Sequence, residues 1–316
     1  MKDIIPAIPR SVLRKELNES TFLRTTNKGN NLIFLVDAHT APQVLQEVGR
    51  LREMAFRASG GGTGKALDLD QYDLGDIPYQ QLVVWDPEDQ EITSGYRLIS
   101  CDALPRDEKG KIISATAHLF DYSERFAKNY LPYTIELGRS FVQPRYQRGA
   151  PRKGLFALDN LWDGLAAVLL ENPRLKYLFG KVTMYPEYHR EARDRLLAFM
   201  HHFFPDPERL VTPTVPLISP EALRPIGQMY DGLDFKAGHQ LLQREVRQRG
   251  EVIPPMINSY MNLSPSMKTF GTAENDNFGK VEETGILITL DDIYPERKQR
   301  YFDSYQHCQT YPGHPS

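Results

Sequence analysis

Four short pieces of the sequence place charged side chains inside segments that otherwise look buried. They contain, in chain order, Arg52, the acidic run Asp70-Gln71-Tyr72-Asp73, Arg97, and the pair Glu136 and Arg139. Charge inside an apolar segment needs partners or a function. Two aspartates, a glutamate and three arginines would neutralise one another around one cleft. Spacing alone leaves two interpretations open, a structural ion-pair network and a catalytic site.

The first charged residue lies on a predicted helix. Apolar residues recur at helical spacing over 41–58, after the strand-length apolar run 32–36. Arg52 interrupts the apolar face of this helix, and Phe56 follows one turn later.

The remaining charges lie on predicted strands. Residues 81–85 and 91–99 flank a turn, which predicts an antiparallel hairpin with Arg97 in the middle of its second strand. Residues 132–142 predict a further strand that carries Glu136.

Side chains alternate between the two faces of a regular strand. Glu136 and Ser140 are therefore expected on one face and Arg139 on the other. A bulge near Gly138 would change this alternation, because it inserts one extra residue.

Two other motifs are weaker than they look. The run Ser59–Ala66 resembles a phosphate-binding loop, but Ala66 stands where a hydroxyl is needed, and the run follows a helix instead of a strand. We therefore expect no nucleotide there. His201 and His202 are adjacent, so they point to different helix faces, and no metal site is expected.

The composition is that of an ordinary globular protein. The 316 residues are 25% charged and 41% hydrophobic, and 38 basic against 41 acidic residues give a net charge of −3. This balance argues against nucleic acid as a partner. Cys101 and Cys308 have no metal-like spacing, so a reducing, cytoplasmic compartment is expected. We expect neither a membrane-spanning segment nor an export signal.

The order of the charged motifs resembles that of a known family. Arg52-x-x-x-Phe56, Asp70-x-x-Asp73, a strand Arg97 and Glu136-x-x-Arg139 look like the signature of the acyl-homoserine-lactone synthases. The stretch from Ile135 to Tyr146, Ile-Glu-Leu-Gly-Arg-Ser-Phe-Val-x-Pro-x-Tyr, is more similar to their relatives, the ornithine-lipid N-acyltransferases. The likeness extends over roughly residues 31–290.

The resemblance implies an α/β (α+β) GNAT-like acyl-CoA N-acyltransferase fold, with a mostly antiparallel, splayed central sheet and helices on both faces. In domain terms it implies an N-terminal arm over 1–30 and a catalytic core over 31–204. Residues 205–316 would form a helical insertion and strands that complete or extend the sheet.

The resemblance also implies a reaction. A long, 3-hydroxylated fatty acyl chain would move from acyl carrier protein to the α-amine of an amino acid, ornithine or glycine. The product would be an N-acyl amino acid, and the donor would be a phosphopantetheine thioester, with no bound cofactor and no metal. The alternatives are a homoserine-lactone-type synthase that uses S-adenosylmethionine, and a non-catalytic acyl-binding module.

Roles for individual residues follow from this chemistry. Attack by an amine needs a base, for which Glu136 is the candidate, with Arg139 beside it. Substrate binding is expected from Arg52, Phe56, Asp70, Asp73, Arg97, Phe141 and Val142. Among these, the acids would hold the acceptor ammonium, an arginine would clamp its carboxylate, and backbone amides near Phe141 and Val142 would stabilise the oxyanion.

Docking of the acidic carrier protein is expected on a basic stretch. It comprises Arg145, Arg148, Arg152 and Lys153. The same cations would suit peripheral contact with an anionic membrane at the inner face, and a solvated surface loop is the alternative. The glycines of this loop lack the spacing with which acetyltransferases of this fold bind a pyrophosphate, which favours a carrier protein over acetyl-CoA.

Overall fold

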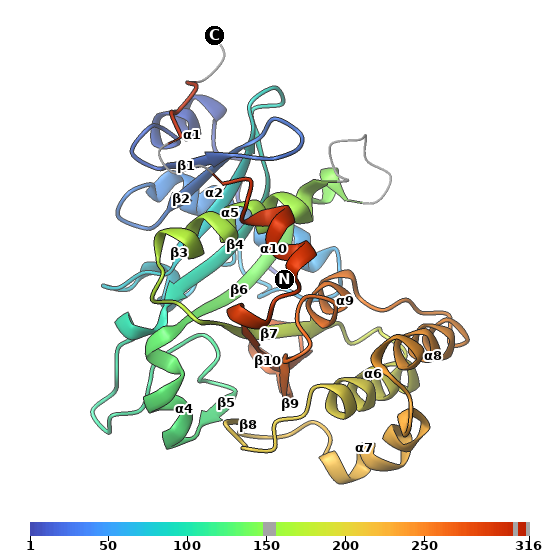
Figure 1. Cartoon of the computed structure of the whole chain (residues 1–316). Coiled ribbons are helices and arrows are strands. Elements are labelled where there is room, and N and C mark those ends of the chain that lie inside the picture. The colour runs from blue at the N-terminus through green and yellow to red at the C-terminus, as the bar shows by residue number, and fades with distance from the viewer. Residues whose placement is uncertain (148–155, 306–308, 314–316) are drawn as a thin grey trace. The chain divides into compact units, whose positions relative to one another are not determined.

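The computed structural model describes residues 1–147, 156–305 and 309–313, which form two compact units. The first unit comprises residues 1–105, 135–175 and 295–316, and the second comprises 106–134 and 176–294. The units alternate along the chain (Figure 1), whereas the sequence predicted three consecutive parts, 1–30, 31–204 and 205–316. The difference arises because strands that are distant in the sequence pair with one another.

The first unit is built on antiparallel strands in the order β1-β2-β3-β4-β6. Their bounds are β1 Phe22–Thr25, β2 Leu32–Val36, β3 Gln80–Asp86, β4 Glu91–Ser100 and β6 Thr134–Val142. The predicted hairpin is confirmed as β3 and β4, and the predicted strand 132–142 is confirmed as β6.

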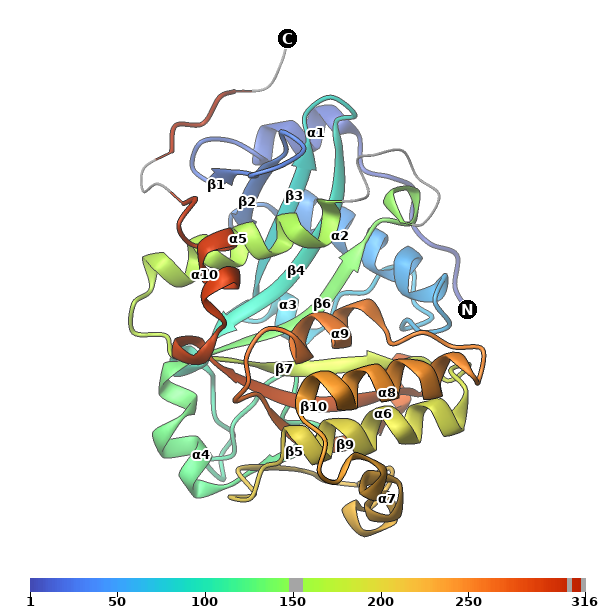
Figure 2. The same cartoon turned by 45° about the vertical axis from the view of Figure 1, so that its right-hand side comes forward.

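Helices cover both faces of this sheet (Figure 2). They are α1 Arg10–Glu16, α2 Pro42–Arg57, α3 Gln71–Leu74, α5 Ala157–Glu171 and α10 Pro295–Tyr301. Gln81 and Leu82 are neighbours on β3 and therefore point to opposite faces. Arg52 of α2 donates to Gln81, whereas Gly164 of α5 lies against Leu82.

Residues 1–30 differ from the predicted arm. They contain α1, in which Leu13 is buried, and β1, which pairs with β2. Leu13 and Leu17 are four residues apart, so both turn to the same side and bury there. The segment is thus part of the core of the first unit.

The second unit combines a three-stranded antiparallel sheet, in the order β7-β10-β9, with the strand pair β5 and β8. The strands are β5 Phe120–Tyr122, β7 Tyr177–Met184, β8 Val211–Pro213, β9 Lys268–Asn275 and β10 Val281–Thr289. The helices are α4 Glu124–Asn129, α6 Arg190–Phe203, α7 Pro220–Gly227, α8 Phe235–Arg247 and α9 Pro255–Met261.

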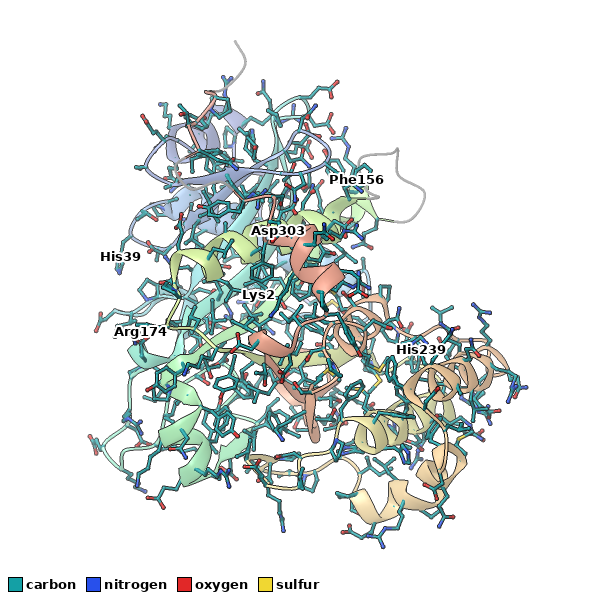
Figure 3. All side chains as sticks on the ribbon, viewed as in Figure 1. Lys2, His39, Phe156, Arg174, His239 and Asp303 are labelled. Carbon is teal, nitrogen blue, oxygen red and sulfur yellow. The ribbon has the colours of Figure 1, made fainter. Side chains whose placement is uncertain are left out.

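Aromatic rings pack α6 against α8. Phe199 of α6 has ring-centroid distances of 5.7 Å to Phe235 and 6.0 Å to His239 of α8. His239 is labelled in Figure 3. His202 lies on α6 with its Nδ1 atom 3.8 Å from Asp231. Among the described residues, no group of three or more His, Cys, Asp or Glu side chains is arranged to hold a metal.

In the described part of the chain, no helix combines the length and the apolar character needed to cross a bilayer.

We predict that Gly164→Ala destabilises the first unit. A Cβ there would lie 2.6 Å from Leu82 Cδ1 and 3.0 Å from Ile33 Cγ2. Overpacking of this kind costs about 1–3 kcal/mol, against about 1 kcal/mol gained in helix propensity. Urea denaturation should therefore show a net loss of stability. Gly227→Ala, at the end of α7, is the control, because apart from its chain neighbours and the backbone of its own helix no described heavy atom lies within 4 Å of that Cβ position. Equal stability of both variants would contradict the close approach of α5 to the sheet.

Candidate active site

A β-bulge in β6 sets the direction of the charged side chains. The register between β4 and β6 shifts opposite Tyr96, where β6 has two residues, Arg139 and Ser140, against one. Arg139 has a φ of 51°, in the left-handed region that side chains other than glycine seldom adopt. The bulge anticipated near Gly138 is thus confirmed.

The bulge brings Phe141 onto the face of Glu136. Gly95 and Arg97 are two residues apart on β4 and share a face, and they pair with Phe141 and Gly138 respectively. A Cβ on Gly95 would lie 2.6 Å from Phe141 Cε1, so the ring covers this glycine. Glu136, two residues before Gly138, belongs to the same face.

The predicted alternation after Gly138 is therefore wrong. The extra residue turns Ser140 to the opposite face from Glu136. Arg139 reaches Asp68, with Nε 3.0 Å from Oδ2, and Asp68 is also bound by Arg52. One inserted residue thus gathers the third arginine with the others.

Arg52 lies at the centre of the resulting ion-pair network. Its side chain is 0% exposed, with Nε 3.0 Å from Asp68 Oδ2 and Nη1 3.1 Å from Asp73 Oδ1. Burial alone would lower the pKa of Arg52, but Asp68 and Asp73 more than offset burial and raise it. Gln81 Oε1 accepts a further bond from Nη1, at 3.4 Å. These contacts hold Arg52 to the acidic segment and to β3.

The acidic run is a helix cap. The Asp70 side chain accepts bonds from the backbone amides of Tyr72 and Asp73, while Asp73 Oδ2 accepts from the amide of Asp70. This reciprocal arrangement is a capping box, and it explains the D-x-x-D spacing. The cap leaves the Asp70 side chain 25% exposed, whereas Asp73 is fully buried.

Arg97 uses only part of its guanidinium in the network. Nη1 lies 2.8 Å from Asp70 and 3.3 Å from Asp73, and the group lies over the rings of Tyr79 and Tyr72, 5.1 and 5.8 Å from their centroids. Within the described residues, the buried Nε has no hydrogen-bond partner. Burial would lower the pKa of Arg97, but Asp73 and Asp70 outweigh it and raise the pKa. The Nε and Nη2 edge, which suits a carboxylate, makes none of these ion pairs.

Glu136 is buried near these groups, with 1% of its surface exposed. Burial raises the pKa of the Cys101 thiol, and the charge of Glu136 raises it further. Burial also raises the pKa of Tyr72, and Asp70 and Glu136 both add to this shift. The Tyr72 hydroxyl is therefore within electrostatic range of both carboxylates.

The backbone amides after the bulge point to alternate edges of β6. Gln143 N donates to Thr93 O at 2.8 Å, so its amide points toward β4. Successive amides of a strand point to opposite edges. The amide of Val142 therefore points to the other edge of β6, while that of Phe141 points to β4.

The glycine-rich loop holds a carboxylate of the chain itself. Glu53 accepts bonds from the amides of Thr63 and Gly64, at 3.0 and 2.7 Å, and from the side chain of Arg57 at 2.8 Å. Burial would raise the pKa of Glu53, but these hydrogen bonds lower it. The amides that resembled a phosphate-binding loop are thus occupied by Glu53.

The basic stretch is only partly described. Arg145 is exposed, and its Nη1 lies 2.9 Å from Glu91 Oε1. Arg148, Arg152 and Lys153 lie outside the described residues.

The structure brings most of the predicted site residues together. The network contains Arg52, Asp70, Asp73, Arg97 and Arg139. Phe56 is buried in α2, one turn after Arg52. Four further members were not predicted from the sequence: Asp68, Tyr72, Tyr79 and Gln81. Asp68 had a signal, since it stands two residues before Asp70, whereas Gln81 at the start of a strand had none.

Two curated proteins are similar to this chain along nearly its whole length. A glycine N(alpha)-acyltransferase of Phocaeicola vulgatus is 50% identical over 306 residues, which cover 96% of this chain and 94% of that protein. A glycine N(alpha)-acyltransferase of Bacteroides thetaiotaomicron is also 50% identical over 306 residues, with 96% and 91% covered. The chain belongs to their family of N-acyltransferases.

The family model of the acetyltransferase (GNAT) domain matches residues 51–157 of this N-acyltransferase. That range contains every member of the ion-pair network, from Arg52 to Arg139. The predicted GNAT-like fold, with its mostly antiparallel sheet, and the predicted acyltransferase activity are confirmed. The comparisons support N-acylation of an amino acid as the class of reaction.

Solved structures give more distant likenesses to the N-acyltransferase. The AHL synthase LasI is 11% identical with a TM-score of 0.42, and 88% of this chain and 98% of that one are covered. FeeM, an N-acyl amino acid synthase from uncultured soil microbes, is 10% identical with a TM-score of 0.40, and 85% and 93% are covered.

Asp73→Asn should destabilise the fold. Arg52 and Arg97 depress the pKa of this buried carboxyl against the opposing effect of burial. A depressed folded-state pKa contributes stability above the unfolded value of about 3.9, which is lost as the pH falls toward the folded value. Removing one partner of a buried pair costs about 3–5 kcal/mol. We expect a loss of this size at pH 7 by urea denaturation, and a weaker fall in stability below pH ~4 than in the wild type.

Asp70→Asn is the matched variant. Its side chain is partly exposed, and asparagine is a good N-cap, so we expect the fold to be retained. Unchanged stability of Asp73→Asn at pH 7 would contradict the network as described.

Proposed function

We propose that this protein transfers a long, 3-hydroxylated fatty acyl chain from acyl carrier protein to the α-amine of an amino acid, with glycine as the acceptor. The observation that carries the proposal is the edge of Arg97 left over from its ion pairs, on the same sheet face as Glu136. The names of the two relatives that are 50% identical favour glycine over ornithine.

In this proposal the acceptor enters as a zwitterion. Its carboxylate takes two parallel hydrogen bonds from Nε and Nη2 of Arg97, which is the geometry that guanidinium groups offer to carboxylates. The rings of Tyr72 and Tyr79, over which the guanidinium lies, and the pairs with Asp70 and Asp73 hold the guanidinium in place. The partly exposed Asp70 carboxylate attracts the acceptor ammonium.

Glu136 acts as the base. An ammonium has no lone pair, so one proton must leave before the nitrogen attacks, and Glu136 takes it directly or through one water. The amine nitrogen then bonds to the thioester carbonyl carbon. The Val142 amide supports the negative charge that develops on the carbonyl oxygen. The carbon–sulfur bond breaks, and the pantetheine thiolate takes the proton that Glu136 held and leaves as a thiol. The nitrogen loses its second proton to water, which leaves the neutral amide.

The donor in this proposal is acyl carrier protein. Acyl carrier proteins are acidic, and a cluster of exposed cations accelerates encounter with an acidic partner. Arg145 is the described member of the basic stretch. The same stretch would bring the enzyme to an anionic membrane, where a lipid product must go.

Glu136→Gln should abolish acyl transfer. The amide preserves the shape of the side chain and removes its basicity, and a general base contributes about 10²–10⁴-fold to the rate. Thiol release from long-chain acyl carrier protein with glycine measures this, with circular dichroism as the check on folding. Activity within about twofold of the wild type would exclude Glu136 as the base. Release of methylthioadenosine from S-adenosylmethionine by the wild type would instead favour a homoserine-lactone-type reaction.

Reversing Arg148 and Arg152 to glutamate should raise KM for acyl carrier protein more than for an acyl-pantetheine without the protein, and the effect should fade as salt increases. Lys109→Glu, in the exposed turn of the second unit, is the control for a change of charge elsewhere. Liposome flotation of the same variants separates membrane contact from carrier docking. Wild-type behaviour in both assays would leave the basic stretch as a solvated surface.

A further inference from the structure

Gly138 is a glycine that neither backbone strain nor close packing explains. Its φ lies outside the left-handed range, so the backbone would accept a side chain. Apart from its chain neighbours, no heavy atom of the described residues lies within 4 Å of the position of a Cβ. Gly95, on the facing strand, shows the contrast, because a Cβ there would meet the ring of Phe141 at 2.6 Å.

The open space over Gly138 lies between two groups of opposite charge. Arg97 is its direct partner on β4, and Glu136 precedes it by two residues on the same face of β6. Arg97 and Glu136 are 3% and 1% exposed, whereas Gly138 is half-buried. Gly138 is therefore the accessible point between a buried cation and a buried carboxylate.

The spacing of these groups suits a small zwitterion. Arg97 and Glu136 are diagonal neighbours across the strand pair, a relation that separates Cα atoms by about 7–8 Å and side chains by somewhat less. A molecule with one carboxylate and one ammonium on the same carbon can reach both groups only if its central carbon lies over Gly138. A side chain at position 138 would take that place.

We propose that Gly138 is the floor of the acceptor subsite, and that its missing side chain determines which amino acids can enter. The inference rests on the proposed function, because it takes an amino acid as the acceptor. It adds that the subsite admits a small α-amino acid with its α-carbon over Gly138, and that the efficiency of acylation falls as the acceptor side chain grows.

The competing explanation is structural. Gly138 immediately precedes Arg139, the left-handed residue of the bulge. If the bulge required a glycine before it, Gly138→Ala would disturb the fold and not only the acceptor. Thermal unfolding separates the two explanations. If the backbone at Gly138 is relaxed, the Gly138→Ala protein should unfold at or above the wild-type temperature.

The test compares Gly138→Ala and Gly138→Val with the wild type, and uses Gly227→Ala as the matched control with equally open surroundings. A methyl group in a binding pocket changes kcat/KM by about 10–200-fold. We expect Gly138→Ala to keep its unfolding temperature, to raise KM for glycine about tenfold, and to leave KM for the acyl donor within about twofold. Gly138→Val should raise KM for glycine further, and Gly227→Ala should leave it unchanged.

The wild-type protein offers a second test, the rate at which it acylates amino acids of increasing size. Acylation of glycine, alanine, serine and valine should fall in the order of side-chain volume, and equal rates with all four would overturn the role of Gly138. Folded Gly138 variants with wild-type KM for glycine would overturn it as well, as would loss of the fold in Gly138→Ala. If the wild type acylates neither glycine nor ornithine, the proposed function itself fails, and this result is obtained before any variant is compared.

Discussion

A buried guanidinium fixes the arrangement of this site. Arg52 is 0% exposed, and removing such a charge from water costs several kcal/mol unless its partners are in place. Those partners are Asp68 and Asp73, and each of them binds a second arginine, Arg139 or Arg97. Helix α2, the acidic segment and strands β4 and β6 must therefore all be positioned before all of these charges are satisfied. The network behaves as one cooperative unit.

The network also divides the charged residues by what they can reach. The side chains of Arg52 and Asp73 are 0% exposed, and in the proposed reaction they hold the other charged groups in place. Asp70 is partly exposed, and one edge of Arg97 is left over. The two interpretations of the charged motifs, a structural network and a catalytic site, are therefore compatible, because the buried part of the cluster orients the part that faces the acceptor in the proposed reaction.

The sequence predicted the elements better than the contacts. Periodicity located α2, the β3 and β4 hairpin and β6, because burial of one face determines these patterns directly. It failed for residues 1–30, where a short helix buries only a few apolar side chains. It could not predict that Gln81 contacts the ion-pair network, because this depends on strand pairing. Nor could it predict the sheet face of Arg139, which depends on the left-handed backbone at that residue. The order of the charged motifs along the chain was enough to indicate the family, because this order can be read from the sequence without knowing which side chains contact one another.

The binding of Glu53 by the glycine-rich loop has a consequence for how this chain can vary in length. Arg52 and Glu53 are adjacent on α2. Arg52 binds Asp68, and Glu53 accepts hydrogen bonds from the amides of Thr63 and Gly64. The stretch between Gly64 and Asp68 is thus anchored at both ends to one turn of helix, so an inserted or deleted residue there would pull an aspartate away from its arginine. The glycines at 60–62 lie before the first anchor, where an added residue can loop outward. Length changes among natural or designed variants of this protein should accordingly collect before Thr63 and be absent between Gly64 and Asp68.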